Sequence, residues 1–389
     1  MKTIRLAVIS SHPIQYYTPL FRVLSKRLAL KVFYAHRATS SDQAQAGFGV
    51  GFKWDIDLLS GYEHEFLRNA SRKPGLDRFA GVDTPEIGAR LRAGKFDAVL
   101  LTGWRLKCFH QALWAAKRLR LPLMARGDSH LDTPRGRWKR WAKALVYPLF
   151  LRCFDAALIV GARNRAYWRR YGYPAARMFD SPHCVDNAWF SARASRAARD
   201  ALRARLGVNA NTKLILFAGK LLAFKRPLDV VEAVARLRGE AQAVELLIAG
   251  AGPLESALRK KAAELGVPLH CLGFCNQSQM PAAYAAADAL ALASNGQETW
   301  GLVVNEALAC GCPVVVAESV GCAPDIAARI GKEAVFATAD TAALAAALLT
   351  ALRAPPSKQR LSEVSRAFSL EAAAIGIEMA ARNVIFSDA

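Results

Sequence analysis

The sequence lacks several features that would fix its class at once. Its eight cysteines form no Cys-x-x-Cys pair and stand near no His-rich segment, so we expect no zinc site. Scattered cysteines with mostly apolar neighbours are typical of reduced thiols in a cytoplasmic protein.

No stretch approaches the roughly 18 consecutive apolar residues of a membrane span. The apolar run near the start, about five residues long, predicts a buried strand rather than a signal peptide. Any contact with a membrane is therefore expected to be peripheral.

Acidic residues are scarce in the first half of the chain only. Residues 1–190 hold 32 Lys and Arg against 14 Asp and Glu, a net charge of +18, whereas residues 191–389 hold 21 against 18, a net charge of +3. Such a field attracts phosphates, either in nucleic acid or on an anionic membrane surface. The sign of the charge does not choose between them, so a non-catalytic binder of anionic lipid or nucleic acid remains an alternative.

The length and the order of elements predict two α/β domains. A chain of 389 residues with 53% hydrophobic content suits two cores of somewhat under 200 residues each. Apolar strands alternate with helical patterns in both halves, which indicates doubly wound parallel sheets. We place the domains at residues 1–195 and 205–367, with a linker near residues 187–210. Residues 41–80 have no clear periodicity and predict a long irregular excursion that borders an acceptor site.

The stretch Ser294–Pro313 holds two glutamates, Glu298 and Glu306, between a predicted buried strand and a predicted helix. Ligands bind at such strand ends in open α/β sheets. The free amides of a helix start form an anion site, here the amides of Gly301, Leu302 and Val303. The two carboxylates are placed to accept hydrogen bonds from hydroxyls on either side of that anion. The alternative is a solvated loop residue and a charge that stabilises the first helical turn.

A second loop brings cations to the same predicted sheet edge. A buried strand ends at Gly219 and is followed by Lys220, Lys225 and Arg226, before a helix that starts with Pro227. Two or three cations between a strand and a helix suit a diphosphate.

Polar loops also follow the strands of the first half. His12, Gln15 and Tyr16 follow the first strand, and Asp128 and His130 follow the strand that ends near residue 126. We expect these side chains at the ligand edge of the sheet. The alternatives are loop residues that pack on their own helix, and a turn cap or salt bridge.

Residues 135–154 interleave Arg and Lys with Trp and then become strongly apolar around Pro148. A basic amphipathic helix with tryptophans at its apolar boundary is typical of a membrane-surface anchor. A core helix with a solvated cationic face is the alternative.

Three motifs resemble those of one enzyme family. The letters ETWGLVVNEALACGCPVV resemble the E-(seven residues)-E signature of retaining glycosyltransferases of family 4, which have the GT-B fold. The opening SHPIQYYTPLFRVL and the segment SPHCVDNAWF are also similar to this family. The resemblance implies two facing Rossmann-like domains and a terminal helix, residues 368–389, that crosses back onto the first. This sequence departs from the family pattern at Lys220, where the family usually has an arginine. Lysine keeps the positive charge but cannot form the two parallel hydrogen bonds of a guanidinium.

The resemblance also implies the reaction. A sugar would move, with retention, from a UDP- or GDP-type nucleotide diphosphate sugar to a hydroxyl of a glycan or lipid-linked acceptor. No metal and no cofactor beyond the donor substrate is expected. The setting would be bacterial surface polysaccharide or lipopolysaccharide synthesis, at the inner face of the plasma membrane. A GT-B nucleotide-sugar epimerase remains an alternative, and the intact donor motifs make nucleic acid an unlikely partner.

The roles expected from the resemblance fall into three groups. Residues assigned to the chemistry are Lys220, Lys225, Glu298, Asp128 and His130. Residues assigned to the donor are Gly219, Arg226, Gly273, Phe274, Trp300, Gly301, Leu302, Val303 and Glu306. Residues assigned to the acceptor are His12, Gln15, Tyr16 and Arg126.

Overall fold

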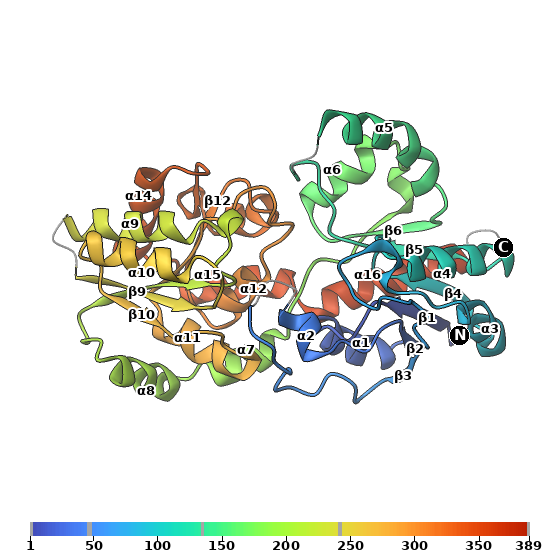
Figure 1. Cartoon of the computed structure of the whole chain (residues 1–389), viewed down its shortest axis with the longest axis horizontal. Coiled ribbons are helices and arrows are strands. Elements are labelled where there is room, and N and C mark those ends of the chain that lie inside the picture. Colours follow the sequence, from blue (N-terminus) through green and yellow to red (C-terminus); the bar gives the residue numbers. More distant parts are fainter. Residues whose placement is uncertain (1–2, 45–48, 134–135, 240–242, 387–389) are drawn as a thin grey trace.

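The computed structural model describes residues 3–44, 49–133, 136–239 and 243–386, and it shows two domains side by side (Figure 1). Each domain is built on one sheet. The strand orders are β3-β2-β1-β4-β5-β6-β7 in the first domain and β10-β9-β8-β11-β12-β13 in the second. All registered strand pairs are parallel. The predicted α/β class with two doubly wound sheets is therefore confirmed.

The first sheet has short, buried central strands, as both of its faces are covered by helices. Its strands are β1 Arg5–Ser10, β2 Ala29–Tyr34, β3 Glu63–Phe66, β4 Ala98–Leu101, β5 Leu123–Arg126, β6 Ala156–Ile159 and β7 Met178–Asp180. Its helices are α1 Tyr17–Ser25, α2 Ser40–Gln43, α3 Ile87–Gly94, α4 Lys107–Arg118, α5 Arg137–Leu151 and α6 Ala162–Arg170.

One strand of this sheet lies where we expected only irregular chain. β3 forms inside residues 41–80 and pairs in parallel with β2 at the sheet edge. Its sequence, EHEF, alternates charge with aromatic rings and carries no apolar run. Lys31 of β2 holds it by ion pairs to Glu63 at 3.1 Å and Glu65 at 3.0 Å. The prediction failed because this edge strand is fixed by cross-strand charge rather than by burial.

The second sheet repeats the same construction. Its strands are β8 Lys213–Ala218, β9 Val244–Ala249, β10 Leu269–Cys271, β11 Ala289–Leu292, β12 Val314–Ala317 and β13 Val335–Phe336. Its helices are α7 Asn187–Arg193, α8 Arg196–Leu206, α9 Pro227–Gly239, α10 Glu255–Glu264, α11 Met280–Ala286, α12 Leu302–Ala309, α13 Ala328–Ile330, α14 Thr341–Arg353 and α15 Lys358–Ala367. None of the helices formed by the described residues is long and apolar enough to cross a membrane.

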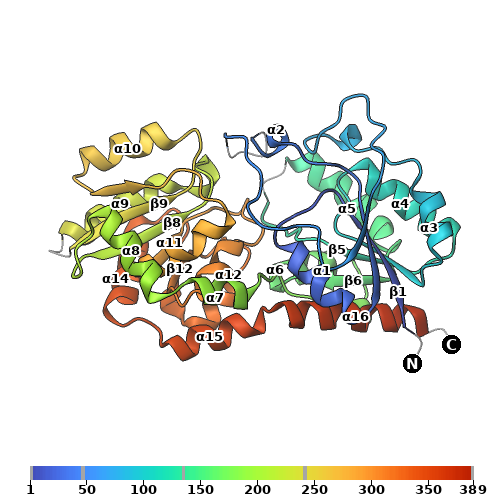
Figure 2. The same ribbon diagram turned by 90° about the horizontal axis from the view of Figure 1, so that it is seen from below.

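Two chain segments join the domains. The region in which we placed the linker is helical, since α7 and α8 occupy it, and Phe190 and Leu202 join the apolar core of the second domain. The last helix, α16 Leu370–Phe386, runs along the first domain (Figure 2). Ala373 and Ile377 of α16 are buried in the same apolar cluster as the residues of α1.

Candidate active site

A cavity of about 480 Å³ lies at the carboxyl ends of β8, β9 and β11, where the second domain faces the first. Its lining combines loops that are far apart in the sequence. From the second domain it includes Gly219, Lys220, Lys225, Phe274, Glu298, Val303 and Glu306, and from the first domain Gln15 and Trp54. We name it the donor cavity, after the role that the sequence analysis predicts for the residues that line it. The structure thus brings together the cations and the carboxylates that the sequence analysis singled out.

The cations of the donor cavity are held close to a carboxylate. Lys225 forms an ion pair with Glu298, and Ser294 Oγ donates to Glu298 Oε2 at 3.2 Å. Burial and the nearby charge of Lys225 lower the pKa of the Lys220 ammonium, and Glu298 opposes the shift. Lys220 and Lys225 are close together and partly removed from water. A ligand with several negative charges would stabilise both of them, so the site suits such a ligand.

Arg226 does not belong to this group, which corrects our prediction. Its backbone is left-handed, with φ of 52°, and its Nε donates to Asp229 Oδ2 at 2.6 Å within the first turn of α9. The local acid, which the loop pattern did not weigh, turns the guanidinium away from the donor cavity.

Glu306 also lines the cavity, from within α12. The hydroxyl of Tyr284, on α11, donates to Glu306 Oε2 at 2.7 Å. Burial raises the pKa of the Glu306 carboxyl to about 7, and the Tyr284 hydrogen bond limits that rise. The carboxylate therefore has one fixed donor and an environment that favours further hydrogen bonds to its charged form.

The turn before α12 has the geometry expected of an anion site at a helix start. Gly301 adopts a left-handed φ of 95°, and a Cβ on it would lie 2.7 Å from Leu292 Cδ2, so a side chain does not fit. α12 begins at Leu302, and Val303 reaches the cavity lining. Leu302 packs against the core, so any contact it makes with a donor must come from its amide.

Trp300 is placed differently from the prediction. Its ring is 4% exposed, and its Nε1 donates to Asn305 Oδ1 at 2.9 Å. It contacts the rings of His183, 5.4 Å away, and Phe368, 5.9 Å away, between ring centroids. The prediction that Trp300 contacts the donor is therefore wrong for its side chain. The ring anchors the loop and packs on the segments that join the domains.

The loop after β10 meets the first domain directly. Gly273 has a left-handed φ of 69°. The ring of Phe274, in the cavity wall, lies 4.1 Å from the ring of Phe52 between centroids. Asp55 accepts hydrogen bonds from the backbone and hydroxyl of Ser278. The sequence analysis expected this excursion beside an acceptor site and did not name Phe52, Trp54 or Asp55. Its closely spaced aromatic residues were the available signal.

Our expectation of no metal overlooked an Asp-x-Asp pair, Asp55 and Asp57, a pattern that often holds a metal. Here the two carboxylates have separate partners. Asp57 accepts from the amides of Leu59 at 3.0 Å and Ser60 at 3.2 Å, whereas Asp55 faces Ser278.

The first-domain candidates divide between the cavity and the interior. Gln15 lines the donor cavity and, with Tyr16, a neighbouring cavity between the domains. His12 lies 2.9 Å from Ser11 Oγ through its Nδ1, and burial together with His36 lowers the pKa of the imidazole to about 4. Burial raises the pKa of the Tyr16 phenol. His12 and Tyr16 are therefore neutral groups at ordinary pH.

Asp128 and His130 are separated by the structure. Asp128 Oδ2 accepts a hydrogen bond from Thr299 Oγ1 at 2.7 Å, across the boundary between the domains. Thr299 directly follows Glu298 in the sequence. His130 is fully buried, and its Nδ1 accepts from the amide of Asp132 at 3.3 Å. Asp128 is thus the one that faces the second domain, and His130 is corrected to a residue that shapes its own turn.

Arg126 is also corrected. Its side chain is 1% exposed, and its guanidinium donates to Ser181 Oγ at 3.1 Å and to Pro182 O at 2.8 Å. It fixes the strand end to the segment that leaves the first domain, so it is not available to an acceptor.

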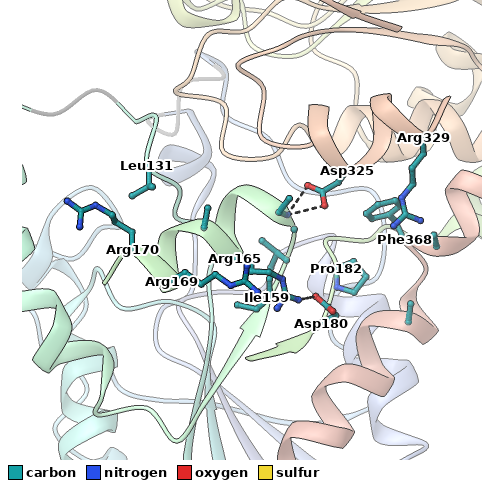
Figure 3. Close-up of a pocket in the computed structure, with 16 residues that line it drawn as sticks. Leu131, Ile159, Arg165, Arg169, Arg170, Asp180, Pro182, Asp325, Arg329 and Phe368 are labelled. Carbon is teal, nitrogen blue, oxygen red and sulfur yellow. Dashed lines mark hydrogen bonds and ion pairs between the residues drawn. The ribbon is translucent and has the colours of Figure 1, made fainter. Parts of the chain in front are cut away.

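A larger cavity, of about 940 Å³, lies near the segments that join the domains (Figure 3). Asp325 accepts there from the amide of Ala162, with both oxygens within 3.0 Å, and Arg165 pairs with Asp180. None of the residues assigned to the donor lines it. The residues that line each cavity, rather than its volume, therefore identify the donor cavity as the candidate active site.

Comparison with known proteins shows a likeness to one family over part of the chain. The family model of the group 1 glycosyl transferases matches residues 198–368. This match lies in the second domain and covers less than half of the chain. A D-inositol 3-phosphate glycosyltransferase of Xylanimonas cellulosilytica is 35% identical over 170 residues, 41% of this chain and 40% of the relative. A GDP-mannose-dependent mannosyltransferase of Mycobacterium tuberculosis, named for phosphatidylinositol dimannoside, is 36% identical over 106 residues, 27% of each chain. These matches thus span less than half the length of the curated relatives.

Solved structures extend the likeness to both domains. Anabaena HepE with UDP and glucose gives a TM-score of 0.69 at 16% identity, covering 97% of this chain and 98% of that one. WaaG, a glycosyltransferase involved in lipopolysaccharide biosynthesis, gives 0.61 at 17% identity, covering 97% and 99%. At this identity the likeness shows the fold, and that fold is GT-B, as predicted.

Proposed function

We propose that this protein is a retaining glycosyltransferase of the family 4 type. It would transfer a sugar from a UDP- or GDP-type nucleotide diphosphate sugar to a hydroxyl of a glycan or lipid-linked acceptor. The observation that carries the proposal is the donor cavity, in which Lys220, Lys225, Glu298 and Glu306 converge from separate loops of the matched domain. The donor class is supported by relatives and structures named for GDP-mannose, UDP and glucose.

The two lysines would act on the leaving group. Breaking the bond between sugar and phosphate leaves negative charge on the diphosphate, and fixed cations stabilise that charge more than they stabilise the bound donor. Lys220 and Lys225 would supply the cations, and the amides at the start of α12 would face the distal phosphate. These groups perform the task that a divalent metal performs elsewhere, so the proposed reaction needs no metal and no cofactor.

The two glutamates would position the donor. Glu306 would accept hydrogen bonds from the ribose hydroxyls, while Phe274 and the backbone at Gly273 would meet the base. Glu298 would accept from hydroxyls of the donor sugar. Because Glu298 also pairs with Lys225, it would hold that cation in place when the donor is absent.

The acceptor would approach from the first domain. His12, Gln15 and Tyr16 follow β1, and Asp128 follows β5, so the acceptor would lie between these loops and the donor sugar. In a front-face attack the departing phosphate oxygen assists removal of the acceptor proton, and no separate base is required. Asp128, held by Thr299, would orient the acceptor hydroxyl.

The proposed setting is bacterial surface polysaccharide or lipopolysaccharide assembly at the inner face of the plasma membrane. The net charge of +18 in residues 1–190 supports a site near anionic lipid. The fold likeness to WaaG is consistent with this setting.

The test is nucleotide release from UDP-glucose and GDP-mannose, with and without lipid-linked acceptors. We expect acceptor-dependent release, and a loss of about 100-fold in turnover for Lys225→Ala, as for other contacts to transition-state charge. Lys260→Ala, at an exposed lysine of α10 that pairs with Glu264 at 3.8 Å, is the matched control. Unchanged turnover of a folded Lys225→Ala variant would reject the assignment, and release without any acceptor would favour the epimerase.

A further inference from the structure

Helix α5 turns its apolar side outward. Five of its large hydrophobic residues are between 59% and 81% exposed, and they are Trp138, Trp141, Leu145, Val146 and Leu149. Their spacing of three, four, one and three residues places them on one side of a helix. We name these five residues the α5 face. Figure 1 shows α5 at the outer edge of the first domain, away from the second sheet.

The opposite side of α5 already has its packing partners. Lys143 Nζ lies 4.2 Å from the ring centre of Tyr147 and 4.5 Å from that of Tyr167, on α6. Leu151 is fully buried, and Phe150 packs beside Phe154. Leu151 is the only buried residue of α5, so α5 is not a core helix, and its apolar residues are solvated as well as its cationic ones.

Cations surround the α5 face and acids are absent from this stretch of sequence. Residues 133–154 contain six Lys or Arg and no Asp or Glu. Within the described chain, Arg137, Lys139 and Arg140 are exposed and form no ion pair with an acid. α6 adds Arg169 and Arg170, both exposed. An apolar stripe with tryptophans and a basic border matches the interface of an anionic bilayer.

We propose that the α5 face docks this protein on an anionic lipid bilayer. Trp138, Trp141, Leu145 and Leu149 enter the boundary between headgroups and acyl chains, and the neighbouring cations contact lipid phosphates. A second copy of the chain is the disfavoured occupant, because two such faces would bring like charges together around the apolar contact. An anionic surface satisfies both the apolar stripe and the charge.

The α5 face is linked to the candidate active site through the chain. Asp128 lies in the segment of sequence between the end of β5 at Arg126 and the start of α5 at Arg137. Docking through α5 would therefore set that segment near the bilayer, where a lipid-linked acceptor presents its hydroxyl. This last step rests on the proposed function, whereas docking itself does not.

Docking is tested by flotation of the full chain with vesicles. We expect binding to vesicles of phosphatidylcholine and phosphatidylglycerol, weaker binding to phosphatidylcholine alone, and a decline as salt is raised. The double variant Trp138→Ala, Trp141→Ala should lose at least about tenfold in binding, because two large apolar side chains no longer enter the lipid. Trp114→Ala, at a 64% exposed tryptophan of α4, is the matched control and should bind like the parent.

Two further measurements separate the outcomes. Brominated phosphatidylcholine should quench the tryptophan fluorescence of the parent, and this quenching should be lost in the double variant. Leu149→Glu gives a second variant if the first does not fold. Unchanged flotation of both folded variants overturns the proposal, and so does a concentration-dependent dimer that the same variants abolish. Nucleotide release with a water-soluble acceptor should be unaffected, so loss of docking and loss of activity are distinguishable.

Discussion

Burial in the donor cavity disfavours the charged form of the Glu306 carboxyl. Burial raises its pKa from 4.5 to about 7, and Tyr284 supplies one hydrogen bond that favours the charged form. Because the native carboxyl binds a proton more tightly than the unfolded one, this group's contribution to stability falls as pH rises from about 4.5 to about 7, and it is constant above. The native chain tolerates that loss at neutral pH, where a ligand can use the carboxylate.

Donor binding should therefore depend on pH through Glu306. If only the carboxylate accepts the ribose hydroxyls, the Kd for UDP-glucose or GDP-mannose should be about tenfold higher at pH 6 than at pH 8. Calorimetric titration of the intact donor across this range measures it. A nucleotide sugar is a better probe than the free diphosphate, whose own phosphate titrates nearby.

Two variants test whether Glu306 is the group responsible. Glu306→Gln should bind weakly at every pH and show no such dependence. Tyr284→Phe removes the hydrogen bond that lowers the pKa, so the midpoint should move above about 7. A pH dependence that persists in Glu306→Gln would assign the titration to another group.

Among the elements, α16 shows how closely the crossing helix is fitted to the first domain. A Cβ on Gly376 would lie 1.8 Å from the backbone oxygen of Asp180 and 3.2 Å from Ser181 Cα. These are backbone atoms at the end of β7, so they cannot move aside as a flexible side chain would. By contrast, a Cβ on Gly88 in α3 would make an ordinary contact, 3.5 Å from Ala115 Cβ.

The same substitution in these two helices should have opposite effects. Alanine gains up to about 1 kcal/mol in helix propensity over glycine. At Gly376 the overlap should outweigh this gain, so Gly376→Ala should lower the thermal midpoint by several degrees, for a loss of about 1–2 kcal/mol. Gly88→Ala should leave the midpoint unchanged or raise it slightly. Equal midpoints for the two variants would show that α16 can shift away from β7.

The elements also show what the sequence can and cannot predict. β1, β8 and β11 are apolar runs bounded by turn residues. Because such strands are buried on both faces, they can be predicted from the sequence. β3 and β7 are edge strands, fixed by partners that are distant in the sequence. The candidate site divides in the same way. Lys220 and Lys225 follow a strand and line the donor cavity, so their assignment stays a prediction that the geometry allows. Arg126 ends a strand at the same kind of sheet edge but turns inward to Ser181, which no local pattern reveals.

At the scale of the whole molecule, polar contacts hold the two domains together around the donor cavity. Asp55 contacts Ser278 on one side, and Asp128 accepts from Thr299 on the other. Each such bond contributes about 1 kcal/mol to the closed arrangement. Residues from both domains line the donor cavity. We therefore expect domain closure to accompany donor binding, with these bonds contributing to the closed arrangement.

Removing the Asp55 contact should favour the open arrangement. A loss of about 1 kcal/mol shifts the equilibrium about fivefold, so Asp55→Ala should raise the KM for donor several-fold. Its radius of gyration in solution scattering should also exceed that of the parent when donor is present. Asp57→Ala is the matched control, because Asp57 contacts Arg22, Leu59 and Ser60 within its own domain. If both variants scatter and react like the parent, the segment around Asp55 does not take part in closure, and the contacts at Asp128 must carry it.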